Sequence, residues 1–177
     1  RWAISSFQEL FYRANEQNLL LEVHTTHWIW FLIIPVLGSL TVGLVLYFFC
    51  DEERNGSVAD VIEGAALNNG RVNSKFGIIS TIISLITLTT GGSTGREGPV
   101  VHLAATISTY ISNLTNIQGI SARDLMGCAV AAAVSASFNA PIAGALFALE
   151  VILRHFAIHA FAPIAISSVA GTIVGRY

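Results

Sequence analysis

"GGSTGREGP", residues Gly91 to Pro99, interrupts a strongly apolar region of this 177-residue chain. No charged residue lies in the run 76–95 or in the run 98–122, and between these runs Arg96 and Glu97 stand side by side. Glycine commonly follows a helix and proline commonly begins one, so the stretch predicts a break between two apolar helices. Broken helices of this kind indicate a binding site inside a membrane protein, because irregular backbone there must be buried or line a cavity.

The composition of the chain is that of an integral membrane protein. Hydrophobic residues make up 53% and charged residues 11%, against about 25% charged in a soluble domain. The formal net charge of −2 is too small to predict a nucleic-acid partner. We expect no metal or other cofactor, because no metal-ligand spacing exists around Cys50 or Cys128.

An enzyme is not expected either. The acids at membrane depth are Glu97 and Glu150, and no serine or cysteine has an evident partner base. The chain begins at Arg1 and its one methionine is Met126, so we expect an internal part of a longer protein.

The apolar segments predict an all-α, polytopic membrane protein with short, broken and re-entrant helices. Residues 28–50 are long enough to span a bilayer, with Trp28, Trp30 and Tyr47 as interfacial anchors. Residues 1–21 indicate the end of a preceding helix or an interfacial helix. The short run 58–67 cannot span and predicts a surface or re-entrant helix.

The second part of the chain repeats the broken pattern. We expect a helix over residues 76–90, then a helix that starts at Pro99 and runs toward Asn113. Small residues fill 127–137, which favours close helix approach. A second break at "FNAP" precedes a helix that starts at Pro141, and the last span covers 155–175. We expect Asn139 to cap the Pro141 helix.

The break has the chemistry of an anion site. Free N–H groups and the helix dipole favour an anion at the start of the Pro99 helix without a lysine's full charge. Glu97 is the chain's own anion at that place, so it could compete with a transported anion and leave when protonated. The structural alternative is a helix cap or an ion pair with Arg96.

Two motifs, "GSTGREGP" and "SFNAPIAGALFALEV", resemble the CLC family of chloride channels and proton-coupled chloride transporters. The resemblance implies that residues 1–177 are a partial CLC transmembrane domain, from the first half of an inverted-repeat architecture. It also implies a homodimer with one pore per subunit, embedded in lipid of the plasma (inner) membrane, with chloride or a similar small anion as its partner. Glu97 takes the place of the family's gating glutamate, and the implied anion-binding residues are Gly56, Ser57, Val58, Arg96, Gly98 and Val100.

The chain departs from the family at its anion-binding serine. The family motif is commonly Gly-Ser-Gly-Ile-Pro-Glu, and the matching stretch here is "NGSVADVIEG". An ungapped match, which we favour, puts Gly56 at the serine position, whereas a shift of one residue puts Ser57 there. In either register, backbone N–H groups at the start of the Val58 helix could serve the anion.

A second departure concerns proton coupling. Proton-coupled members often carry a second glutamate directly after the one in "FALE", and Val151 stands there in this chain. The position therefore lacks an acid for a proton path, which favours a channel; a proton-coupled anion exchanger is the alternative. We expect Glu150 to be a buried structural glutamate paired with Arg154, and His102 to be a hydrogen-bonded packing histidine.

Overall fold

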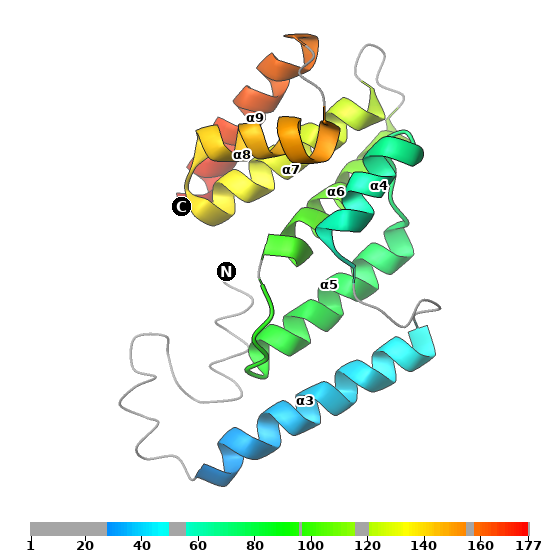
Figure 1. Cartoon of the computed structure of the whole chain (residues 1–177), viewed down its shortest axis with the longest axis vertical. Coiled ribbons are helices and arrows are strands. Elements are labelled where there is room, and N and C mark those ends of the chain that lie inside the picture. The colour runs from blue at the N-terminus through cyan, green and yellow to red at the C-terminus, as the bar shows by residue number, and fades with distance from the viewer. Residues whose placement is uncertain (1–27, 50–55, 96, 116–120, 155–157, 177) are drawn as a thin grey trace. The chain divides into compact units, whose positions relative to one another are not determined.

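The structure is a computed structural model that describes residues 28–49, 56–95, 97–115, 121–154 and 158–176. Every regular element in those ranges is a helix, which confirms the predicted all-α fold (Figure 1). The chain divides into two compact units, Arg1–Asn55 with Ile82–Arg96, and Gly56–Thr81 with Glu97–Tyr177. The prediction for residues 1–21 lies outside the described residues, and so does Arg96.

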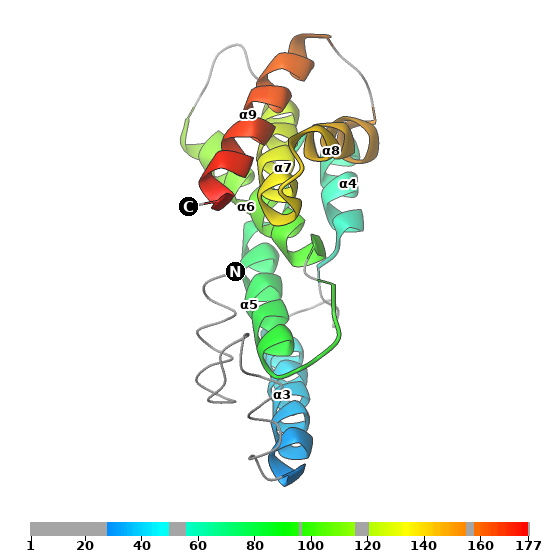
Figure 2. The same cartoon turned by 90° about the vertical axis from the view of Figure 1, so that its left-hand side faces the viewer.

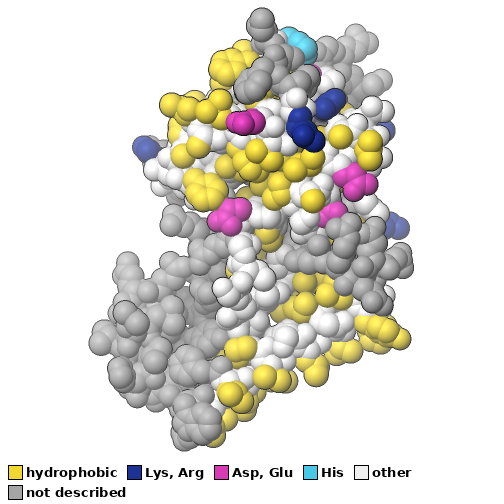
Figure 3. Space-filling model, viewed as in Figure 1, with side chains coloured by type: hydrophobic (Ala, Val, Ile, Leu, Met, Phe, Trp, Pro, Cys, Tyr) yellow, Lys and Arg dark blue, Asp and Glu magenta, His cyan; other side chains and the backbone are white. Residues whose placement is uncertain are grey.

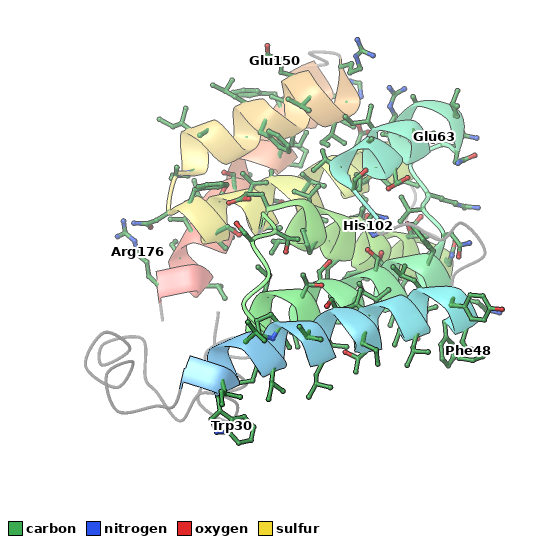
Figure 4. All side chains as sticks on the ribbon, turned by 60° about the horizontal axis from the view of Figure 1, so that its bottom comes forward. Trp30, Phe48, Glu63, His102, Glu150 and Arg176 are labelled. Atoms are coloured by element: carbon green, nitrogen blue, oxygen red, sulfur yellow. The ribbon has the colours of Figure 1, made fainter. Side chains whose placement is uncertain are left out.

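Helix α3 (Trp28–Phe49) confirms the predicted long apolar helix to within one residue. Its stretch Leu32–Phe49 has a mean hydropathy of 2.3 and is, among the described residues, the one helical segment long and apolar enough to cross a membrane. Large apolar side chains remain exposed along α3 (Figure 3). Trp30 and Phe48 point outward near its two ends (Figure 4), so α3 presents the surface that contact with lipid requires.

Thr90, the residue before the glycine break, packs against α3 within the first unit. The side chain of Thr90 occupies the space that a Cβ atom on Gly38 would need. The Thr90 hydroxyl donates to the carbonyl oxygen of Ile86 at 2.9 Å. Beyond it Gly91 has a φ of +90°, a conformation that glycine adopts without steric cost. The helix before the break, α5 (Ser74–Thr89), therefore ends next to Thr90, and the non-helical glycine break begins at Gly91.

Helix α4 (Val58–Leu67) has the bounds predicted for the short apolar run. Its ten residues span about 15 Å, which is half of a bilayer's hydrocarbon core of about 30 Å. It buries Val61, Gly64 and Ala65. It packs against α6 (Glu97–Leu114) and the π-helix η1 (Ala148–Leu153). The next helix, α5 (Ser74–Thr89), matches the predicted range of 76–90 to within two residues.

Helix α6 (Glu97–Leu114) begins two residues earlier than predicted. The prediction put the first helical residue at Pro99, but Pro99 is the third residue of the helix. A proline is accepted throughout the first turn, because the first N–H groups of a helix have no partner within the helix. Glu97 and Gly98 are consequently part of the first helical turn rather than residues that precede it.

The second unit is organised around α7 (Ala122–Phe138), which packs against α6, α8 (Pro141–Phe147) and α9 (Ile158–Arg176). Figure 2 shows α7 running beside α8 and α9. One core cluster joins α4, α6, α7 and η1 through Val61, Ala65, Val101, Ala105, Met126, Val130, Val134 and Ile152. A second joins α7, α8, η1 and α9 through Ala131, Ala145, Ala148, Leu149, Leu153, Ala160 and Ile164.

Small residues allow α7 and α9 to approach closely, as predicted for the run 127–137. A Cβ atom on Gly171 would collide with the backbone of Ala132, and one on Gly175 would lie 3.1 Å from the Cα atom of Ala136. The pair Gly171 and Gly175 therefore has a packing role. At the same interface the hydroxyls of Ser135 and Ser168, both fully buried, share a hydrogen bond.

Candidate functional site

The first turn of α6 carries three of the predicted site residues. Glu97 is its first residue and is exposed, while Gly98 and Val100 are half-buried. A Cβ atom built on Gly98 would meet no heavy atom within 4 Å, so nothing crowds the backbone at this point. The N–H groups of a first turn have no partner within the helix and carry partial positive charge. The backbone around Gly98 is therefore uncrowded at this end of α6. Arg96, the predicted site residue before the helix, lies outside the described residues.

In the segment that leads into α4, the hydrogen-bond donors of Gly56 and Ser57 are bonded to other groups of the protein. The backbone N–H of Gly56, a buried residue, donates to the hydroxyl of Ser80 at 2.9 Å. The N–H and the hydroxyl of Ser57 both donate to the Asp60 carboxylate, at 2.6 and 3.1 Å. Asp60 is the third residue of α4 and closes its first turn, which is the usual job of an acid there. Gly56 has no hydroxyl, and the hydroxyl of Ser57 is already bonded to Asp60.

This geometry bears on the two possible registers of the family motif. In the ungapped register the serine position is Gly56, which has no side chain. In the shifted register it is Ser57, whose hydroxyl is bonded to Asp60. The sequence alone did not identify the role of Asp60, although its position three residues after a serine is a signal for such a cap.

His102 connects α6 with the segment before α4. Its side chain is 1% exposed, and its ring meets the ring of Phe76 edge-on with centroids 5.8 Å apart. Its Nε2 atom lies 3.0 Å from the point where a Cβ atom on Gly56 would sit. Figure 4 shows His102 beside the segment that enters α4. Glu97 precedes His102 by five residues, about 7.5 Å along the helix axis. His102 therefore lies near the segment that enters α4, while Glu97 lies more than one turn further toward the start of α6.

The prediction that His102 is a packing histidine is confirmed, but the predicted hydrogen bonding is wrong. Neither ring nitrogen has a hydrogen-bond partner in the part of the chain that the structure describes. Buried polar atoms in proteins nearly always have a partner, so an exception needs an explanation. The periodicity of α6 could place His102 on the buried face, but only the tertiary structure shows what surrounds its ring.

The region of Glu150 differs from the prediction. Residues Ala148–Leu153 form a π-helix, η1, directly after α8. Glu150 is exposed rather than buried, and no ion pair joins it to Arg154 within the described ranges. The π-helix has more residues per turn than an α-helix, and Arg154 ends it in a left-handed conformation with a φ of +54°. The two side chains consequently lose the α-helical i, i+4 alignment that the pairing assumed.

Val151 is half-buried and packs against the core cluster that joins α4, α6 and α7. By the resemblance, proton-coupled members often carry an acid at this position, whereas this chain has an apolar side chain in contact with apolar neighbours.

The predicted role of Asn139 is also wrong. Asn139 ends α7 in a left-handed conformation with a φ of +54°, which asparagine tolerates better than most residues. Its side-chain oxygen accepts from Nε of Arg176 at 2.8 Å. Helix α8 is preceded by Ala140, whose side chain makes no capping hydrogen bond. At so short a junction an asparagine can end the first helix or cap the start of the second. The left-handed backbone conformation of Asn139 makes it the C-terminal cap of α7.

The chain is similar to chloride channel sequences. The family model described as voltage gated chloride channel matches residues 18–177. A ClcB-like protein of Ralstonia nicotianae is 29% identical over 165 residues, which are 91% of this chain and 38% of that protein. The voltage-gated ClC-type chloride channel ClcB of Escherichia coli is 30% identical over 148 residues, 82% of this chain and 35% of that protein. The chain thus spans a little over a third of the length of these curated relatives.

Proposed function

The chain belongs to the voltage gated chloride channel family, and from this we propose that the complete protein is an integral membrane protein that conducts chloride passively. The observation that carries the proposal is the start of α6. An acidic residue, Glu97, begins this helix after a glycine-rich break, and α6 packs against α4.

The anion would be held by helix ends rather than by a full positive charge. The first backbone N–H groups of α4 and α6 have no partner within their own helices, and each helix dipole favours an anion by about 0.3–1 kcal/mol at an exposed site. The N–H groups of Gly56 and Ser57 donate to Ser80 and Asp60, so these two residues would line the site rather than donate those groups to the anion. The residues that would hold it are Gly56, Ser57, Val58, Arg96, Gly98 and Val100. Binding by partial charges is weak enough to permit fast release, which conduction requires.

Glu97 would act as the gate of this site. Its carboxylate would be a competing anion at the first turn of α6, where the side chain is exposed. When it occupies the site, chloride is excluded; when it is protonated or displaced by chloride, the site opens. The gate therefore responds to both pH and chloride concentration.

The channel mechanism is favoured over proton-coupled exchange by Val151. Proton-coupled members often carry a proton-accepting acid at this position, and an isopropyl side chain packed against apolar neighbours cannot accept a proton. In this proposal residues 1–177 form part of the first half of the membrane domain, two copies of the complete protein associate, and the protein resides in the plasma (inner) membrane.

Flux measurements on the complete protein in liposomes test the proposal. The vesicles are loaded with potassium chloride and diluted into potassium gluconate, with internal pH and external chloride recorded together. A passive channel releases chloride only when a potassium ionophore balances the charge, and the internal pH does not follow chloride.

Two other outcomes are decisive. Proton movement in fixed proportion to chloride, against a proton gradient, would replace the channel by the exchanger. No chloride release above that of protein-free vesicles would overturn the proposed function altogether.

A further inference from the structure

The start of α4 lacks a free hydroxyl but has an unbonded imidazole beside it. Gly56 has no side chain, and the Ser57 hydroxyl is bonded to Asp60. The side chain of His102 is 1% exposed. Neither of its ring nitrogens has a hydrogen-bond partner among the described residues. A buried N–H group without a partner is costly in free energy, so the position calls for a ligand that accepts a hydrogen bond.

The direction of the ring identifies where that ligand would be. A Cβ atom built on Gly56 would lie 3.0 Å from Nε2 of His102. The same Cβ atom would lie 2.8 Å from the hydroxyl oxygen of Ser80. The imidazole thus faces the residue that stands at the family's serine position. The ring is held in this orientation by its edge-on contact with Phe76.

We propose that His102 is an anion-binding residue that sets selectivity, and that its ring N–H takes the place of the missing serine hydroxyl at the start of α4. The ligand class is a small monovalent anion that has lost part of its water shell, such as chloride or nitrate. The inference rests on the proposed function and deepens it, because it assigns the selectivity of the same site to a side chain of α6.

A single directional N–H donor favours chloride over nitrate. Chloride is the smaller and more strongly hydrated ion, so it gains more from a donor that replaces lost water. A neutral histidine has one N–H donor, and the tautomer with the proton on Nε2 directs that donor toward Gly56. Removal of the donor should therefore lower the preference for chloride, while a general loss of packing should lower the flux of both ions alike.

Permeability ratios of the complete protein test the assignment, with chloride and nitrate as the probes. His102→Phe keeps a flat ring and removes both nitrogens, so the chloride-to-nitrate ratio should fall by about three- to tenfold, the ratio that one net hydrogen bond is worth. His102→Gln restores an N–H donor and should keep the ratio within about twofold of wild type. Thr106→Val, which removes another buried hydroxyl one turn along α6, is the matched control and should leave the ratio unchanged.

The outcomes separate this inference from the proposed function. If the wild type conducts and His102→Phe keeps the wild-type ratio, the inference is overturned and the function stands. If the wild type carries no anion, the function itself fails. If His102→Phe does not fold, the nitrogen-15 resonances of His102, assigned by comparison with His102→Gln, give the answer in the wild type. They should move when chloride replaces gluconate, and fixed resonances would overturn the inference.

Discussion

Asp60 is the residue that most directly limits an anion at the start of α4. Its carboxylate accepts from both the N–H and the hydroxyl of Ser57, so a negative charge already occupies donors that an anion would use. This arrangement stabilises the first turn of α4, since an acid at its third residue satisfies backbone donors and complements the helix dipole. The same arrangement opposes anion binding, because like charges at close range repel.

We predict that Asp60→Asn lowers the chloride concentration needed for half-maximal flux. The amide oxygen can still accept from Ser57, but the charge is gone, so chloride should bind about fivefold more tightly, which corresponds to the repulsion of about 1 kcal/mol between charges 4 Å apart in water. The measurement is initial chloride efflux against chloride concentration. Glu63→Gln, which removes an exposed charge one turn further along α4, should not change it. An equal effect of the two substitutions would mean that only the net charge of the protein matters.

At the scale of helices, the close approach of α7 and α9 is the contact most sensitive to one added methyl group. Gly171 lies against the backbone of Ala132, whereas a Cβ atom on Gly43 of α3 would meet no atom within 4 Å. We predict that Gly171→Ala destabilises the complete protein by about 1–3 kcal/mol, the usual cost of overpacking. Gly43→Ala should be neutral or stabilising by about 0.5–1 kcal/mol, because alanine suits a helix interior better than glycine. Thermal unfolding in detergent measures both, and equal midpoints would contradict the close packing seen here.

Most helices could be predicted from the sequence because the residues next to each helix end determine where it begins and ends. The bounds of α4 follow from an apolar run between polar stretches, and the end of α5 follows from the glycines after Thr90. The start of α6 was misplaced because a proline fits more than one position of a first turn. The π-helix η1 and the exposure of Glu150 could not be predicted, since the choice between α and π hydrogen bonding depends on how neighbouring helices pack.

The candidate site was predicted only in part. Its residues at the starts of α4 and α6 came from motif resemblance, and the structure adds the proximity of His102 to Gly56. The hydrogen bonds of Asp60 and the unbonded ring of His102 depend on tertiary contacts, which leave no pattern in one sequence.

At the scale of the whole molecule, the proposed ion path combines the starts of α4 and α6 with the exposed acid Glu97. Residues 18–177 match the family model, and the complete protein is proposed to supply the remainder of the ion path. The central claim is that Glu97 closes this path by competing with chloride at the first turn of α6. His102 and Asp60 are proposed to change how well an anion binds there, and Glu97 alone is proposed to open and close the path.

The chloride current of the complete protein against external pH, for wild type and Glu97→Gln, tests this claim most directly. The amide keeps the shape of the side chain but competes poorly for the positive end of a helix. The account predicts a larger current in Glu97→Gln with a much weaker dependence on pH, whereas Glu97→Asp keeps its pH dependence. Glu150→Gln, which alters an exposed glutamate on η1, should reproduce the wild-type curve. Identical curves for wild type and Glu97→Gln would mean that Glu97 only caps α6 and that the gate lies elsewhere.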